Sequence, residues 1–159
     1  MKISSGSVEE TLKLGRRIAS SLAGGEIILL SGPLGAGKTV LAKGIAQGLA
    51  VDKNEVLSPT FVLLRVYRGK MTLQHFDFYR IKNPAEIAAL GYYDYLYDEA
   101  VTVIEWPERL KSLAPEEFLR ISIVPGVKNR RVFKFAAKGA RYKKIAEKIN
   151  ENTGDRHHH

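Results

Sequence analysis

The segment from residue 32 to residue 39 constrains this chain more than any other, because it fixes a strand, a tight loop and a helix in that order. It reads Gly-Pro-Leu-Gly-Ala-Gly-Lys-Thr and matches the pattern G-x-x-x-x-G-K-[ST] at every specified position. The apolar run at 27–30 precedes it, as expected of a strand buried on both faces of a parallel sheet. An apolar stripe at helical spacing follows it, formed by Val40, Leu41, Ile45 and Leu49. This context predicts a phosphate-binding loop rather than a glycine-rich turn that only caps a helix.

The residue types in this loop predict that it holds the phosphates of a nucleotide together with a magnesium ion. Glycines let successive backbone N–H groups and the helix N-terminus point at the phosphates. The Lys38 ammonium is placed to reach the β- and γ-phosphates, and the Thr39 hydroxyl is the kind of oxygen ligand that Mg²⁺ takes. The expected nucleotide contacts are Gly32, Leu34, Gly35, Ala36, Gly37, Lys38, Thr39 and Val40.

Two acidic residues stand where a phosphate loop needs a carboxylate to support magnesium. Glu105 directly follows the apolar run at 101–104, as expected of an acid at the end of a buried strand. Asp77 lies in the aromatic stretch His-Phe-Asp-Phe-Tyr-Arg at 75–80. Thr60 follows the loop by about 20 residues, where some NTPases carry a threonine that senses the γ-phosphate; a plain Ser-Pro turn is the alternative. We predict that both acids are functional.

Composition excludes several other chemistries. The 159 residues include no cysteine, so disulfides, thiolate zinc sites and cysteine nucleophiles are excluded. His75 is the one histidine outside the run at 157–159, which resembles an expression tag, and one is too few for a histidine-built metal site. No apolar run approaches the roughly 18 residues of a membrane span. We therefore expect a cytoplasmic protein without membrane contact.

The positive charge is concentrated near the C-terminus. The formal net charge is +8, and the stretch 128–148 holds nine lysines and arginines against one acid, Glu147. Outside that stretch, basic and acidic residues balance. The sequence thus predicts one C-terminal basic patch, which meets nucleic acid, an acidic partner or the nucleotide's phosphates, or else forms a solvated strand and helix face.

The order of the patterns predicts an α/β protein with a P-loop NTPase-like three-layer fold. Ser7 and Glu10 form a capping box for a helix to about residue 22. Stretches at 61–67 and 71–79 predict one antiparallel hairpin, and stretches at 118–124 and 131–136 predict another. Asn83 caps a further helix, and a basic helix starts at about residue 140. We expect a mixed, mainly parallel central sheet with appended hairpins, in a single P-loop domain over 1–150 followed by a tail at 151–159.

Five segments together resemble one family. They are the loop at 32–39, Ser-Pro-Thr-Phe at 58–61, His-Phe-Asp-Phe-Tyr-Arg at 75–80, Leu-Gly-Tyr-Tyr-Asp-Tyr at 90–95 and Ile-Glu-Trp-Pro-Glu-Arg-Leu at 104–110. In this order and spacing they resemble the TsaE (YjeE) family, the bacterial ATPase subunit of the tRNA threonylcarbamoyladenosine machinery. The likeness spans about residues 7–135, and its H-x-D-x-Y-R and E-W-P segments are more specific than the phosphate loop.

The resemblance implies a set of roles for single residues. It implies ATP as the nucleotide, magnesium held by Thr39 and Glu105, and a switch-like loop around Thr60. Asp77 acquires a catalytic or water-orienting role, and whether it is a base, a water-orienting group or a metal ligand stays open. The candidate catalytic residues are therefore Asp77, Lys38 and Thr60. The N-terminal helix, through Thr11, is expected to cover the adenine, and Arg130 and Arg131 are weaker candidates for nucleotide contact.

The resemblance also implies partners. These are the transferase subunits TsaD and TsaB, which modify the tRNA adenosine beside the anticodon, with tRNA itself in the complex. Hydrolysis by the isolated chain is expected to be slow. GTP is disfavoured, since neither [NT]-K-x-D nor D-x-x-G is found at the required places. Two alternatives remain: a P-loop small-molecule or nucleoside kinase, and a nucleotide-responsive binding module with negligible turnover.

Overall fold

Helices and strands alternate along most of the chain, as the sequence predicts. The computed structural model describes residues 1–51, 55–57, 63–96 and 98–154. The strands are β1 (Lys2–Ser5), β2 (Ile27–Ser31), β3 (Glu55–Leu57), β4 (Leu64–Tyr67), β5 (Leu73–Asp77), β6 (Val101–Glu105), β7 (Phe118–Pro125) and β8 (Arg131–Lys138). The helices are α1 (Val8–Ser20), α2 (Lys38–Gly48), α3 (Pro84–Ala89), α4 (Tyr92–Leu96), the 3-10 helix η1 (Pro107–Leu113) and α5 (Ala140–Gly154).

The described strands join one mixed sheet, in the order β1-β8-β7-β2-β6-β5-β4-β3. Neighbouring strands from β7 to β5 in that order run parallel. Antiparallel pairs extend the sheet at both edges. The expected P-loop NTPase-like fold, with a parallel centre and appended hairpins, is confirmed. Strand β2 lies in the parallel centre, and ligands in open α/β sheets bind outside the carboxyl ends of such strands.

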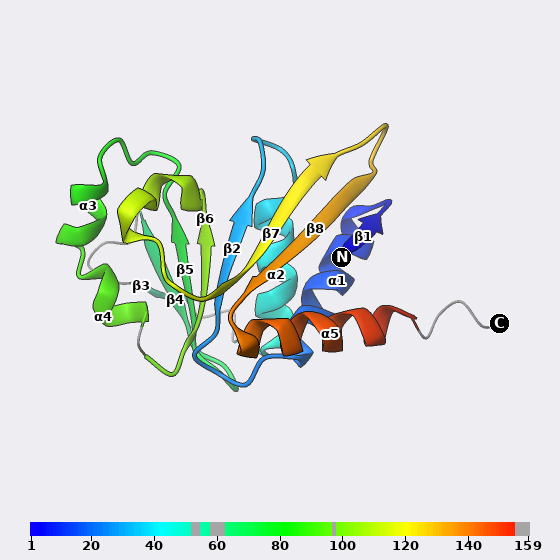
Figure 1. The fold of residues 1–159 in the computed structure, drawn as a ribbon, viewed down its shortest axis with the longest axis horizontal. Coiled ribbons are helices and arrows are strands. Elements are labelled where there is room, and N and C mark those ends of the chain that lie inside the picture. Colours follow the sequence, from blue (N-terminus) through cyan, green and yellow to red (C-terminus); the bar gives the residue numbers. More distant parts are fainter. Residues whose placement is uncertain (52–54, 58–62, 97, 155–159) are drawn as a thin grey trace.

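Helices cover both faces of the sheet and make the fold three-layered (Figure 1). One apolar cluster joins α1, α2 and α5 to the sheet, and a second joins α3, α4 and η1 to the opposite face. Alternate residues of β2 enter the two clusters, with Ile28 and Leu30 on one side and Ile27 and Leu29 on the other. The run at 27–30 is therefore buried on both faces, as its unbroken apolar character predicts. Among the described helices, none combines the length and apolar character needed to cross a bilayer.

Strand β5 is where the structure adds most to the sequence-based prediction. Its antiparallel pairing with β4 confirms the expected hairpin over the described residues. Its other edge pairs in parallel with β6, and the register sets Asp77 opposite Glu105. The two candidate acids therefore end adjacent parallel strands, although they are 28 residues apart in sequence. The hairpin is thus an integral part of the sheet rather than an addition to it.

Several short elements are not predicted by the sequence. Strands β1 and β3 and helix α4 have at most five residues each, which is too short to show a clear period. Strand β1 forms by pairing with β8, a contact between the two ends of the chain. Helix α5 continues to Gly154, so the first four residues of the expected tail are helical.

Helices α1 and α2 lie unusually close together because glycines line their contact. A Cβ atom built at Gly15 would lie 2.7 Å from backbone atoms of Gly44 and Ile45. A Cβ atom at Gly44 would lie 2.5 Å from the carbonyl oxygen of Leu12. At the start of α1, the Ser7 side chain accepts a hydrogen bond from the Glu10 N–H, which confirms the predicted cap. Since α2 begins at the phosphate loop, α1 supports that loop from behind.

We expect Gly15→Ala to lower the free energy of unfolding by about 1 to 3 kcal/mol, because the added methyl forces two backbones apart. Alanine at an unconstrained helix position would instead stabilise by up to about 1 kcal/mol. Urea unfolding followed by circular dichroism measures the difference. Lys13→Ala, at an exposed position of the same helix, is the control and should change stability by less than about 0.5 kcal/mol. A Gly15→Ala protein as stable as the parent contradicts the close contact.

Candidate phosphate-binding site

The loop at 32–39 leaves the carboxyl end of β2 and enters α2, at the same edge of the sheet as the tip of the β7–β8 hairpin (Figure 1). Gly32, Gly35 and Gly37 have φ values of +149°, +76° and +106°, a region that glycine adopts without the strain of a side chain. A Cβ atom at Gly32 would also lie 2.8 Å from the carbonyl oxygen of Ile123. Gly37 caps α2 without a side-chain hydrogen bond, which leaves the first N–H groups of the helix available to an anion.

Lys38 is folded back onto this loop. Its side chain is buried, and Nζ donates hydrogen bonds to the carbonyl oxygens of Gly32 and Pro33, the latter at 2.9 Å. Nζ also lies 4.3 Å from the centroid of the Trp106 ring. Burial lowers the pKa of Lys38, and the negative charges of Glu105, Glu108 and Asp77 oppose that shift. An ammonium held by neutral carbonyls and an aromatic face can exchange them for phosphate oxygens, which bind it more strongly because they are charged.

Trp106 has an unusual backbone conformation beside this lysine. Its φ is +60° and its ψ is +51°, the left-handed region that is uncommon for a residue with a bulky side chain. The residue links β6 to η1, and its ring contacts both Lys38 and the ring of Tyr79, whose centroid is 5.0 Å away. Such conformations gather at functional sites. Here the conformation coincides with an aromatic wall on the phosphate loop.

Glu105 connects three elements at this edge. It ends β6 and is 3% exposed. Its Oε1 accepts a hydrogen bond from Thr39 Oγ1 at 3.1 Å, and its Oε2 lies 2.6 Å from His75 Nε2. Both carboxylate oxygens are therefore oriented by side chains from α2 and β5. The predicted proximity of Thr39 and Glu105 is present in the structure.

The oxygen atoms of Thr39 and Glu105 suit magnesium, a hard cation that takes oxygen ligands. Among the described residues, no group of three or more His, Cys, Asp or Glu side chains could hold a metal by itself. Magnesium commonly binds through one or two protein oxygens, with water and substrate phosphates as its other ligands. The residues present therefore fit a nucleotide-bound magnesium ion better than a metal held by the protein alone.

His75 is the functional candidate that sequence reasoning missed. From the sequence alone the role that suggests itself for His75 is metal binding, and one histidine is too few for such a site. The available signal was its position two residues before Asp77 in a strand, because residues i and i+2 share one face. The position of His75 points to Glu105 only because β5 pairs with β6, and the sequence does not predict that pairing. The contact with Glu105 makes His75 a positioning residue for the buried carboxylate.

Asp77 stands between two cavities. Its side chain is exposed, and Oδ1 accepts a hydrogen bond from the Tyr79 N–H at 3.0 Å. An open cavity of about 290 Å³ is lined by the residues from Leu34 to Val40 together with Asp77, Tyr79, Glu105 and Trp106. A second cavity, of about 450 Å³, lies beside α2 and is lined in part by Thr39, Lys43, Arg65, His75, Asp77 and Glu105. The aspartate thus faces both the phosphate loop and a neighbouring polar space.

The remaining predicted residues divide into three cases. Thr60 lies outside the described residues. Thr11 is buried, with Oγ1 2.8 Å from Ser5 Oγ and 3.2 Å from the Ser7 carbonyl oxygen that it donates to. Those contacts anchor the start of α1, and adenine contact by Thr11 stays a prediction. Of the two weaker candidates, Arg131 reaches the loop, donating from Nη2 to the Gly35 carbonyl oxygen at 3.4 Å, whereas the Arg130 side chain is exposed.

The sheet order and the strand–loop–helix geometry define a protein with a P-loop NTPase-like fold. The family model described as "Threonylcarbamoyl adenosine biosynthesis protein TsaE" matches residues 5–133, and the chain belongs to this family. A relative from Treponema pallidum, named tRNA threonylcarbamoyladenosine biosynthesis protein TsaE, is 40% identical over 77% of this chain and 90% of its own. A relative of the same name from Bacillus subtilis is 34% identical over 91% of this chain and 90% of its own. The resemblance seen in the sequence motifs is confirmed.

A solved structure agrees with this assignment. The crystal structure of Bacillus subtilis YdiB matches this fold with a TM-score of 0.82 at 28% sequence identity. The match covers 96% of this chain and 95% of that chain. The similarity therefore extends over nearly the full length of both chains.

We expect ATP to change the fluorescence of Trp106, the single tryptophan of the chain, because a bound phosphate draws the Lys38 ammonium away from its ring. Lys38→Ala should weaken binding by about 10- to 150-fold, since a charged hydrogen bond contributes about 1.5 to 3 kcal/mol. Fluorescence titration reports both effects, and calorimetry gives the affinity independently. Lys148→Ala, on an exposed part of α5, should match the parent. An unchanged affinity in Lys38→Ala excludes this loop as the ATP site.

Proposed function

We propose that this protein binds ATP with magnesium at the loop 32–39 and hydrolyses it slowly, in support of threonylcarbamoyl transfer to the tRNA adenosine beside the anticodon. The observation that carries the proposal is the hydrogen-bonded series Thr39–Glu105–His75, which lies next to Lys38. It brings a hydroxyl, a carboxylate and an ammonium to one edge of the sheet, as triphosphate binding requires. Membership of a family named for tRNA threonylcarbamoyladenosine biosynthesis supports the pathway.

Each residue of the site has a distinct role in this proposal. The Lys38 ammonium moves from the Gly32 and Pro33 carbonyls to the β- and γ-phosphates. Thr39 and Glu105 are the residues that hold magnesium, and His75 keeps the Glu105 carboxylate in orientation. Magnesium supplies charge neutralisation between the phosphate oxygens when bound. The exposed carboxylate of Asp77 orients or deprotonates the attacking water.

Slow turnover by the isolated chain follows from the arginine positions. Fast hydrolysis generally requires an arginine on the transferring phosphate, an effect of roughly 10³ to 10⁵ in rate. Arg131 approaches the loop but donates to the Gly35 carbonyl oxygen. Arg65 lines the neighbouring cavity rather than the phosphate loop. We therefore propose that the transferase subunits TsaD and TsaB alter the rate, and that the ATP-bound form prefers the complex.

A small-molecule kinase is the alternative to an ATPase subunit, and a neighbouring cavity favours it. The cavity of about 450 Å³ beside Asp77 has basic side chains, Lys43 and Arg65, and is placed to receive an acceptor. ATP labelled at the γ-phosphate separates the readings. Label released as inorganic phosphate supports hydrolysis, label on a small molecule supports a kinase, and intact bound ATP supports a binding module without turnover. Family membership favours the first reading.

We expect Glu105→Gln and Asp77→Asn to act on different steps. Glu105→Gln removes a charge beside Thr39 and should lower the affinity of the ATP-bound protein for magnesium by about 10- to 100-fold. His75→Phe should lower the same affinity by a smaller factor. Asp77→Asn should leave ATP affinity within about twofold and lower turnover by about 10²- to 10⁴-fold. Calorimetry at several magnesium concentrations and single-turnover hydrolysis measure the two effects. Equal losses of ATP affinity in Glu105→Gln and Asp77→Asn would make Asp77 part of the metal site.

We expect the purified TsaD and TsaB subunits to bind this protein more tightly with ATP than with ADP, because γ-phosphate contacts order switch segments in proteins of this fold. Titration in ATP, ADP and no nucleotide measures the preference. Multi-cycle modification of tRNA, with Lys38→Ala as the comparison, measures its consequence. Nucleotide-independent affinity combined with full modification by Lys38→Ala contradicts the ATPase-subunit proposal and favours the kinase.

A further inference from the structure

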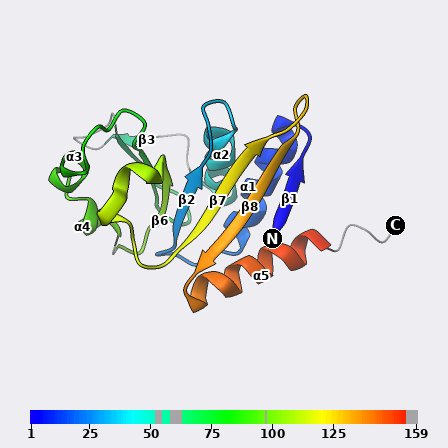
Figure 2. The same cartoon turned by 45° about the horizontal axis from the view of Figure 1, so that its top comes forward.

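The strands at the C-terminal side of the sheet have one face that the described helices leave uncovered. Alternate residues of β7 and β8, such as Ile121 and Phe133, point into the core shared with α1, α2 and α5. The residues between them point to the opposite side, where Figure 2 shows β7 and β8 without a helix in front of them. We call this side the open sheet face. Its polar residues are Lys2, Ser4, Arg120, Ser122, Lys134 and Lys138, and they share it with the apolar residues Phe118, Val124, Val132 and Ala136.

The charged side chains that these three strands place on the open sheet face are all basic. Cross-strand register sets Lys134 opposite Lys2 on one side and opposite Ser122 on the other. Like charges directly opposite one another destabilise a sheet. Among the described residues, none of these lysines forms an ion pair. The Glu117 carboxylate, just before β7, lies against Gly139 at one end of the face. Arg120 and Lys138 lie 5.7 and 5.8 Å from the centroid of the Phe118 ring, whereas Lys2 and Lys134 face each other across the strands. A bound polyanion would relieve that repulsion.

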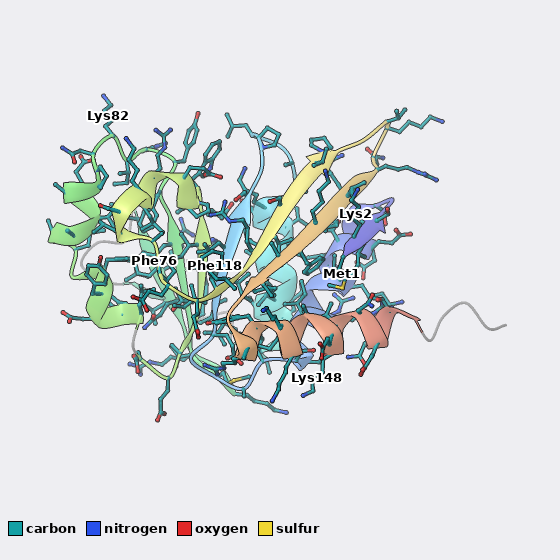
Figure 3. All side chains as sticks on the ribbon, in the orientation of Figure 1. Met1, Lys2, Phe76, Lys82, Phe118 and Lys148 are labelled. Carbon is teal, nitrogen blue, oxygen red and sulfur yellow. The ribbon has the colours of Figure 1, made fainter. Side chains whose placement is uncertain are left out.

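The fold separates the basic residues that the sequence gathers into one C-terminal patch. Arg131 reaches the phosphate loop, and Arg141 pairs with Glu26 at 3.4 Å. Lysines on the exposed side of α5 share their helix with acidic residues, and in Figure 3 Lys148 projects below α5 while Lys2 lies beside β1. The expected single patch is therefore wrong. Lys2 and Arg120, from outside the stretch 128–148, instead join Lys134 and Lys138 on the open sheet face.

We propose that the open sheet face binds the phosphate backbone of tRNA. Lysine, arginine and serine are the side chains that usually contact nucleic-acid phosphates, and here serines lie between the basic residues. An acidic protein surface would also complement a basic face, and competition with polyglutamate distinguishes that partner from tRNA. Arg120 also donates to Ser31 Oγ at 3.4 Å, so the face reaches the strand that leads into the phosphate loop. The choice of tRNA rests on the proposed function, whereas the affinity for RNA phosphate rests on this face alone.

Charge removal from the face tests the proposal. The probe is a fluorescently labelled, unmodified tRNA transcript, and anisotropy is measured between 50 and 300 mM KCl without nucleotide. Four phosphate contacts predict a slope of log K against log[salt] of about −2.8 to −3.6. The double variant Lys2→Ala/Lys134→Ala removes two contacts and should halve that slope to about −1.4 to −1.8. Its circular dichroism spectrum and ATP turnover should match those of the parent, since neither residue touches the phosphate loop.

The matched control is Lys143→Ala/Lys144→Ala, which removes the same charge from exposed positions of α5 and should leave the slope unchanged. Equal losses in the two double variants overturn the proposal, because binding then follows net charge alone. Displacement of tRNA by polyglutamate at equal charge concentration also overturns it, in favour of an acidic protein. Absence of binding at 50 mM KCl has the same consequence. Lys38→Ala should keep tRNA binding, so failure of the ATP site and failure of this face give different results.

Discussion

The buried carboxylate of Glu105 is the constraint on which the site depends. A buried carboxylate is destabilising unless hydrogen bonds satisfy its oxygens, and here the partners are Thr39 on α2 and His75 on β5. These contacts require β6 to lie between β2 and β5 with all three strands parallel. The strand order is therefore tied to the chemistry of the site, since a different strand in place of β5 beside β6 would remove His75 as a partner of the carboxylate.

Close contacts on two sides of the phosphate loop leave no space for larger side chains. Behind it, glycines bring α1 within van der Waals distance of α2, with Gly15 against Gly44. Beside it, Ile123 of β7 approaches Gly32 closely enough to exclude a side chain there. Close packing transmits displacement rather than absorbing it. Asp77 and Tyr79, which line the other side of the cavity at this loop, are exposed instead.

Local signals predicted the parts of this protein that local chemistry determines. The loop at 32–39, the cap at Ser7, the capping box at Asn83 and the acid after the apolar run each need only neighbouring residues, and each is present. The parallel pairing of β5 with β6, the contact of His75 with Glu105 and the strand β1 depend on segments far apart in the chain. Periodicity carries no information about which strands become neighbours. For the same reason, the sequence could not predict which basic residues share a face of the sheet.

The hydrogen bonds of Lys38 to Gly32 and Pro33 also shape what the site can distinguish. The loop's own carbonyls act as an internal competitor, because any ligand must replace them as acceptors for the ammonium. A neutral nucleoside offers no stronger acceptor and gains nothing from the exchange, while each additional phosphate increases the advantage over the carbonyls. In the proposed ATP site, this competition would rank ligands by the number of phosphates they carry before any contact with the base contributes, so adenosine would be rejected without a dedicated barrier.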